Sequence, residues 1–161
     1  MGAATSLLYG KAEMIIADSS YKSFKSLCKQ VAKEHSPVVV PNCMITCFFP
    51  CVFSKLKKDV DKRAKYDVED LDVRESVKNL DPKTIVVFMS GDRDVLILPR
   101  NSQKLYDICP CKEKYLKIFD GDHNSKRPEN IMREVMGLIE NFIKRESEMK
   151  RESEMKRKSL E

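Results

Sequence analysis

Two aspartates and one histidine stand where this sequence could support proton transfer. Asp92 and Asp94 follow the run TIVVFMSG, and His123 follows KYLKIF in the segment FDGDHN. A carboxylate can orient an imidazole and stabilise its charged form, and the imidazole can then take a proton from a serine hydroxyl. An acid followed by a histidine is the second half of a serine–acid–histidine order. Taken singly, either aspartate could close a turn, and His123 could be an ordinary turn residue.

The elements that would position these residues are strands separated by helices. Three apolar runs predict strands: AEMIIAD, TIVVFMSG and KYLKIF. Strands that alternate with helices imply a parallel sheet with right-handed crossovers. The carboxyl ends of such strands meet at one edge, where functional groups gather. We therefore expect an α/β fold of about three parallel strands flanked by helices, with Asp94 and His123 at the same edge.

Helical patterns lie between and after these runs. They are AATSLLYG, which Gly10 would end, then SSYKSFKSLCKQVAKE, PRNSQKLYDIC and PENIMREVMGLIENFIKRE. The acidic segment DVEDLDVRESVKNLDPK predicts a connector with a short helical piece. Residues 36–66 are mixed. Their apolar part, 36–53, contains three prolines and is too short to predict a comfortable membrane span.

Length and composition indicate one domain with a hydrophobic core, followed by a charged tail. The chain has 161 residues, 42% of them hydrophobic, and a net charge of +5. Basic and acidic residues are interleaved and tryptophan is absent, so we expect no nucleic-acid partner. No export signal is recognisable, which favours a cytoplasmic location. Residues 144–161 contain the repeat KRESEM twice and predict a solvated helical or disordered tail, with weak membrane contact as the minor alternative.

The six cysteines leave two interpretations open. Reduced thiols are the simpler one for a cytoplasmic protein. Cys43, Cys47 and Cys51 are spaced by four, so a helix would place them on one face. Zinc is the alternative, with Cys109 and Cys111 completing the ligands. The spacing fits no usual zinc pair, and we expect no metal.

Five segments together give the chain a family resemblance over most of residues 1–143. It resembles the α/β-hydrolase superfamily, in particular its Bem46-like and serine aminopeptidase-type serine hydrolases. The segments are MGAATSLLYG, IIADSSYKSF, KYDVEDLDVRESV, VVFMSGDRDVLILPRNSQKL and IFDGDHN. The first is similar to the stretch just after the nucleophile in a G-x-S-x-G turn. The resemblance implies a partial hydrolase domain over 1–143, with the tail at 144–161, acting on a small acyl substrate without a cofactor.

The same resemblance assigns roles to individual positions. Asp94 matches the acid, with Asp92 as the second choice, and His123 matches the general base. Met1 matches the position whose backbone N–H helps to form the oxyanion hole. Residues 37–66 match the lid. Three phenylalanines there could line an acyl pocket or simply pack in the core: Phe48, Phe49 and Phe53.

Three positions depart from the family pattern. Asp122 stands where a glycine often precedes the histidine, so its carboxylate could perturb His123. Leu98 occupies the usual place of a proline, which is displaced to Pro99. The nucleophile serine would precede Met1, and Thr5 and Ser6 lie too far into the first helix to replace it.

The missing serine leads to two expectations. We expect this polypeptide alone to lack triad hydrolysis, because Asp94 and His123 have no serine to activate. We also expect it to self-associate through the sheet edge that the missing strands would cover. The alternatives are a hydrolase-like domain that binds a partner or lipid without catalysis, and the zinc module.

Overall fold

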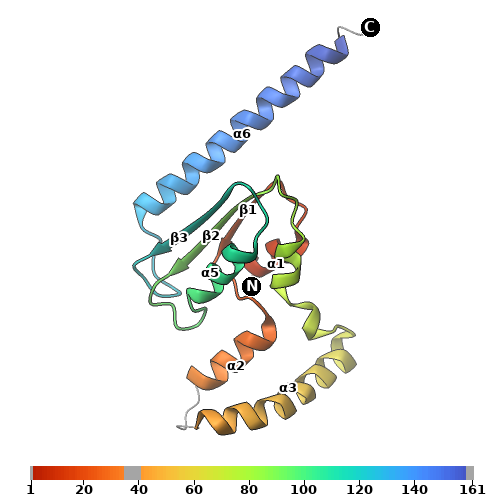
Figure 1. Cartoon of the computed structure of the whole chain (residues 1–161), viewed down its shortest axis with the longest axis vertical. Helices are drawn as coiled ribbons and strands as arrows, with labels where there is room; N and C mark the ends of the chain where they lie inside the picture. Colours follow the sequence, from red (N-terminus) through yellow and green to blue (C-terminus); the bar gives the residue numbers. More distant parts are fainter. Residues whose placement is uncertain (1, 35–40, 159–161) are drawn as a thin grey trace. The chain divides into compact units, whose positions relative to one another are not determined.

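Three parallel strands form the centre of this computed structural model, which describes residues 2–34 and 41–158. The strands are β1 (Met14–Asp18), β2 (Ile85–Gly91) and β3 (Lys114–Phe119). The helices, with one 3-10 turn, are α1 (Gly2–Tyr9), α2 (Phe24–Glu34), α3 (Asn42–Ala64), η1 (Val68–Asp70), α4 (Val73–Lys78), α5 (Arg100–Ile108) and α6 (Glu129–Lys158). The predicted class, three parallel strands flanked by helices, is confirmed (Figure 1).

The strand register brings the carboxyl ends of all three strands to one edge. The sheet order is β1-β2-β3, and both pairings are parallel. Asp18 lies opposite Met89, and Gly91 lies opposite Phe119. The loops that follow β2 and β3 therefore begin side by side. Within the described residues β1 pairs with β2 alone, so it is an edge strand.

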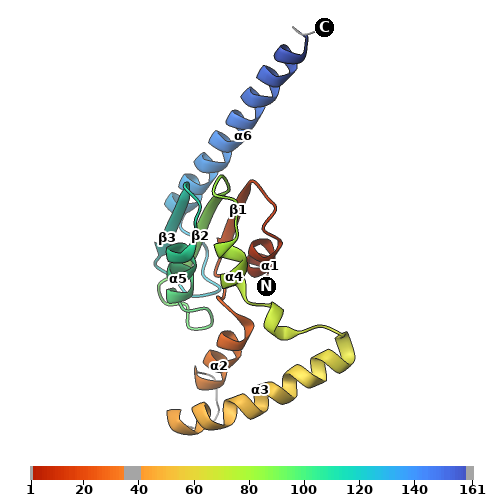
Figure 2. The ribbon, with the colours of Figure 1, turned by 45° about the vertical axis from the view of Figure 1, so that its right-hand side comes forward.

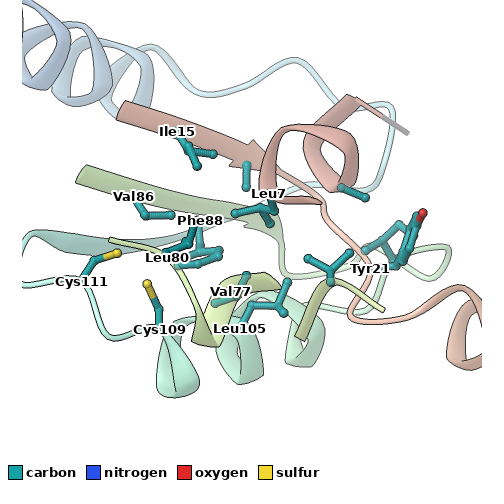
Figure 3. Close-up of a cluster of buried hydrophobic side chains, with 14 residues drawn as sticks. Leu7, Ile15, Tyr21, Val77, Leu80, Val86, Phe88, Leu105, Cys109 and Cys111 are labelled. Carbon is teal, nitrogen blue, oxygen red and sulfur yellow. The ribbon is translucent and has the colours of Figure 1, made fainter. Parts of the chain in front are cut away.

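A hydrophobic core lies between the sheet and three helices. Figure 2 shows α1, α4 and α5 next to one another beside the sheet, and all three contact each other or the strands. Figure 3 shows the side chains that meet there, among them Leu7, Val77, Phe88 and Leu105. All four are fully buried. Every residue of β2 is buried, as the continuous apolar run predicts for the middle strand of a parallel sheet.

Glycine ends α1 as the sequence predicts. Gly10 has a φ of +62°, in the left-handed region that a Cβ atom disfavours, and its N–H donates to the Ser6 carbonyl at 3.1 Å. This turn and residues 11–13 carry the chain from α1 into β1. A substitution at Gly10 would also bring a Cβ atom to 3.3 Å from the Leu80 side chain.

The segment that matched a lid holds the long helix α3. Its residues 37–40 lie outside the described part of the chain, and its role as a lid stays a prediction. Pro50 lies inside α3, and Lys65 ends the helix in the left-handed conformation, donating its N–H to the Asp61 carbonyl at 2.8 Å. No helix in the described ranges is long and apolar enough to cross a bilayer.

The C-terminal part of the chain is a second compact unit, residues 126–161. Its helix α6 continues from the amphipathic segment through both KRESEM repeats to Lys158. Met149 and Met155, one from each repeat, are 56% and 63% exposed. The predicted division at residue 143 falls within this continuous helix, and it stays a prediction.

Candidate functional site

Asp94 is buried in the loop that follows β2, with both carboxylate oxygens engaged. Its side chain has no exposed surface. Oδ1 accepts a hydrogen bond from the Ile97 N–H at 2.7 Å, and Oδ2 lies 2.8 Å from the His123 Nδ1 atom. The first bond fixes the carboxylate to its own loop. The second oxygen is thereby aimed at the histidine.

His123 comes from the loop that follows β3. Because an ionised carboxylate can only accept, Asp94 selects the tautomer in which Nδ1 carries the proton. In that tautomer Nε2 is the basic nitrogen. The His123 side chain is 34% exposed, so the ring is supported by the protein on one side and accessible on the other. A buried acid that orients a half-exposed imidazole is the arrangement required for general base catalysis.

Helix α2 holds the loop that carries Asp94. The Gln30 side-chain amide donates to the Val95 carbonyl at 2.9 Å and to the Leu96 carbonyl at 3.0 Å. Gln30 is itself buried. The loop segment that binds the Asp94 carboxylate is therefore held by helix α2, through a residue that lies 65 positions earlier in the sequence.

Asp92 fastens the two loops to each other, and Asp94 is the aspartate that pairs with the His123 ring. The Asp92 Oδ1 atom accepts from the Gly121 N–H at 3.0 Å, and the Asp92 N–H donates to the Phe119 carbonyl at 2.8 Å. The Arg93 N–H donates to the Gly121 carbonyl at 3.0 Å, and the Arg93 guanidinium pairs with Asp120. Asp92 thus belongs to the framework that sets the distance between Asp94 and His123.

Asp122 is engaged with its own turn. Its carboxylate accepts from the Asn124 N–H at 2.8 Å, and the Asp122 N–H donates to the Ser125 hydroxyl at 2.9 Å. Hydrogen bonds from the Ser125 side chain and the Asn124 backbone lower the pKa of Asp122. Asp122 therefore closes the turn that presents His123.

A cavity of about 180 Å³ opens beside His123. Its wall is mostly apolar, and two serines and a tyrosine also line it. The lining residues are Ala4, Ser19, Ser20, Tyr21, Leu27, Val31, Leu96, Ile97 and His123. Burial raises the pKa of Tyr21, so its hydroxyl stays protonated over the physiological range. The cavity can hold a small apolar group against the imidazole.

The two serines of this cavity had no predicted role in the site. Ser19 follows β1 directly and has a φ of 52°, a left-handed conformation unusual for a residue with a Cβ atom. Its N–H donates to the Met89 carbonyl at 2.9 Å, which ties the turn to β2. The signal was available, since Ser19 and Ser20 stand at the carboxyl end of a predicted strand, as Asp94 and His123 do.

The three phenylalanines of α3 do not form part of that wall. Phe53 is 4% exposed and stacks on Phe49, with 5.6 Å between ring centroids. The Lys25 ammonium lies 5.5 Å from the centroid of the Phe53 ring. Phe48 points outward and is 61% exposed. Of the two interpretations, packing describes Phe49 and Phe53. Met1, the predicted oxyanion residue, lies outside the described residues.

Cys28 is partly buried, and the other five cysteines separate into an exposed and a buried set. Cys43, Cys47 and Cys51 are exposed on α3, whereas Cys109 and Cys111 are buried near β3. Among the residues that the structure describes, no three metal-binding side chains come together. The zinc alternative therefore receives no support from this geometry.

This separation predicts two classes of thiol reactivity. The exposed thiols should react with a maleimide or disulfide reagent within seconds to minutes. Cys109 and Cys111 should react only on unfolding, because they are buried, and burial together with Cys109 raises the pKa of Cys111 to about 12. Mass spectrometry of the alkylated peptides over time measures this. Equal rates for Cys47 and Cys111 would contradict the burial described above.

Solved structures similar to this chain include two distant neighbours. No protein-family model matches the chain, and no curated protein matches it. Acetyl xylan esterase 1 from Thermoanaerobacterium sp. JW/SL YS485 is 15% identical, with a TM-score of 0.49 over 81% of this chain. The monoacylglycerol lipase of Paleococcus ferrophilus is 17% identical, with a TM-score of 0.46 over 86% of this chain. This chain spans 39% and 63% of their respective lengths. At these values neither neighbour assigns an activity.

Proposed function

We propose that this chain carries the acid and the base of a serine hydrolase of the α/β-hydrolase superfamily. The proposed branch is the Bem46-like and serine aminopeptidase-type hydrolases, acting on esters, thioesters or related acyl compounds. The observation that carries the proposal is the 2.8 Å approach of the buried Asp94 carboxylate to the His123 ring. The edge position of both residues and the matching segments on either side support the same interpretation.

In the proposed reaction His123 Nε2 takes the proton of a serine hydroxyl as the oxygen attacks the acyl carbon. Asp94 stabilises the imidazolium that forms and keeps the ring oriented. The same proton then passes to the leaving group, and water releases the acyl group from the serine in a second, equivalent cycle. The nucleophile in this proposal is a serine that precedes Met1 in a longer protein, and the Met1 N–H contributes to the oxyanion hole.

The cavity supports a short acyl group as the substrate portion. Its volume of about 180 Å³ is below the roughly 300 Å³ at which pockets for larger ligands begin. Its apolar side chains, such as Leu27, Leu96 and Ile97, suit a hydrocarbon chain better than a sugar. We also propose a cytoplasmic location, which the six free thiols suit, and self-association through the open edge of β1.

Fluorophosphonate labelling tests the proposal. A longer protein in which G-x-S directly precedes Met1, so that Met1 and Gly2 complete the G-x-S-x-G turn, should label at that serine and hydrolyse short p-nitrophenyl esters. His123→Ala should lower its kcat/KM by about 10⁴-fold, because no base then activates the serine. The chain alone should not label, and His123→Ala in it should change no measurable ester hydrolysis.

The second histidine of the chain provides the matched control. His35→Ala should leave labelling and hydrolysis unchanged in both proteins. Clear labelling of the chain alone would contradict the proposed upstream serine, and peptide mapping would show whether Ser19 or Ser20 carries the label. Full activity of the His123→Ala variant in the longer protein would remove the proposed base altogether.

A further inference from the structure

Helix α3 has one face that is exposed along most of its length. Residues spaced by three and four along a helix share a face. The outward residues follow this spacing over about five turns: Met44, Cys47, Phe48, Cys51, Lys55, Lys58 and Lys62. All of them are exposed, with Met44 at 47% and Phe48 at 61%. From Met44 to Lys62 this outward face extends about 27 Å along the helix.

The outward face changes character halfway along. Residues 42–54 contain no charged side chain. Residues 55–65 contain six basic and two acidic side chains. Apolar and basic groups therefore share one face but occupy successive turns. Val52, next to this face, adds a further apolar side chain that is 65% exposed.

The opposite face of α3 is fixed to the rest of the unit. Phe53 is buried, and Lys57 pairs with Asp67 at 3.0 Å and with Glu69. Helix α3 packs against α2 and η1. The outward apolar residues therefore cannot turn inward without breaking these contacts. Exposed apolar clusters of this kind mark interaction surfaces.

We propose that this outward face of α3 docks on an anionic lipid membrane. Met44, Phe48 and Val52 would enter the boundary between head groups and acyl chains. Lys55, Lys58 and Lys62 would contact lipid phosphates. Amphipathic helices that lie in the interface combine an apolar part with lysines in this way. Clustered basic side chains add attraction to the negative membrane surface.

Charge and shape favour lipid over a second copy of the chain. Two copies packed in parallel through this face would set lysines against lysines, which is unfavourable. A lipid surface offers hydrocarbon and phosphate side by side along the whole face. The proposal does not depend on the proposed hydrolase, and its test measures no activity.

Vesicle flotation of the full chain tests the proposal. Vesicles of phosphatidylcholine alone are compared with vesicles that also contain about 30% phosphatidylserine. Binding should be strong only with phosphatidylserine, and should fall when salt is raised from about 0.1 M to about 0.5 M. Lys55→Gln, Lys58→Gln and Lys62→Gln together should weaken binding about a hundredfold, which is about fivefold for each lysine. Met44→Ser with Phe48→Ser should weaken it about tenfold or more.

The tail provides matched controls with the same chemistry. Met149→Ser with Met155→Ser removes two equally exposed apolar residues from α6. Lys150→Gln, Arg151→Gln and Arg157→Gln together remove three charges from it. These variants should bind as the unmodified chain does. If they lose binding while the α3 variants keep it, the tail is the membrane contact and the proposal is overturned. Circular dichroism confirms that each variant remains folded.

A probe on Cys47 locates the contact directly. Cys47 is exposed in the middle of the apolar part, so an environment-sensitive fluorophore can be attached after Cys28, Cys43 and Cys51 are changed to serine, while the buried Cys109 and Cys111 stay unreacted in the folded chain. Its emission should shift to the blue on adding phosphatidylserine vesicles. A shift that appears without lipid and grows with protein concentration would instead assign the face to contact between copies, and would overturn the proposal.

Discussion

Asp94→Asn is expected to move the proton of the His123 ring from Nδ1 to Nε2. The asparagine oxygen can still accept from the Ile97 N–H, so the loop and its stability should change little. The amide nitrogen then faces Nδ1 and donates to it, where the carboxylate accepted. The Nε2 atom would then carry a proton and could not accept one from a serine hydroxyl. In the proposed longer protein with its serine we expect kcat to fall about 10⁴-fold.

The tautomer can be measured in this chain without any nucleophile. Long-range nitrogen–proton NMR correlations distinguish a protonated Nδ1 from a protonated Nε2. The original chain should show Nδ1 protonated, and the Asp94→Asn variant should show the reverse. Asp92→Asn is the matched control, because Asp92 binds the Gly121 N–H whereas Asp94 holds the ring. The same tautomer in the original chain and in the Asp94→Asn variant would contradict the pairing described here.

Gly91→Ala is expected to be the most destabilising single change in the described sheet. A Cβ atom at residue 91 would overlap the Gly121 carbonyl group, with its carbon only 2.9 Å away. Residue 91 and the Gly121 carbonyl lie in the backbone at the beginning of two loops, which follow β2 and β3 and are hydrogen-bonded to each other. Neither segment can therefore move aside without losing these hydrogen bonds. We expect a loss of about 3 kcal/mol in the free energy of unfolding. This corresponds to a melting temperature about 10 °C lower.

Thermal unfolding followed by circular dichroism measures this loss. Gly137→Ala in α6 is the control, because a Cβ atom there meets nothing within 4 Å. Alanine also favours helix more than glycine does, so the control should be neutral or stabilise by up to about 1 kcal/mol. A Gly91→Ala protein as stable as the original would mean that the two loops lie further apart than described.

The sheet and the edge that carries Asp94 and His123 could be predicted from sequence because their signals are local. β1, β2 and β3 are short runs of apolar residues between turn-forming residues, and their parallel pairing followed from the alternation with helices. The meeting of Asp94 and His123 followed from their places after neighbouring strands. The choice between Asp92 and Asp94 needed the three-dimensional arrangement, in which Asp92 is bound to the other loop.

The local sequence pattern did not predict that the α3 segment forms one continuous helix. Pro50 removes one backbone donor and normally ends a helix, so the segment is mixed in sequence. The structure keeps α3 helical on both sides of Pro50, anchored by Phe53 and the Lys57 ion pairs. The cavity was also out of reach, because its wall joins residues from α1, α2 and three loops. Such a wall depends on packing between distant segments and not on any local pattern.

The six-residue repeat of α6 has a geometrical consequence for variation in length. Six residues at about 100° each advance the helix by about 240°, so Met149 and Met155 lie about a third of a turn apart. Consecutive copies therefore distribute their methionines around the helix and do not form a continuous apolar stripe along it. Gaining or losing one copy would change the reach of the helix by about 9 Å and leave its solubility almost untouched. A change in the number of repeats should therefore be tolerated. We expect homologous chains to vary more in the number of these repeats than in the sequence of the sheet.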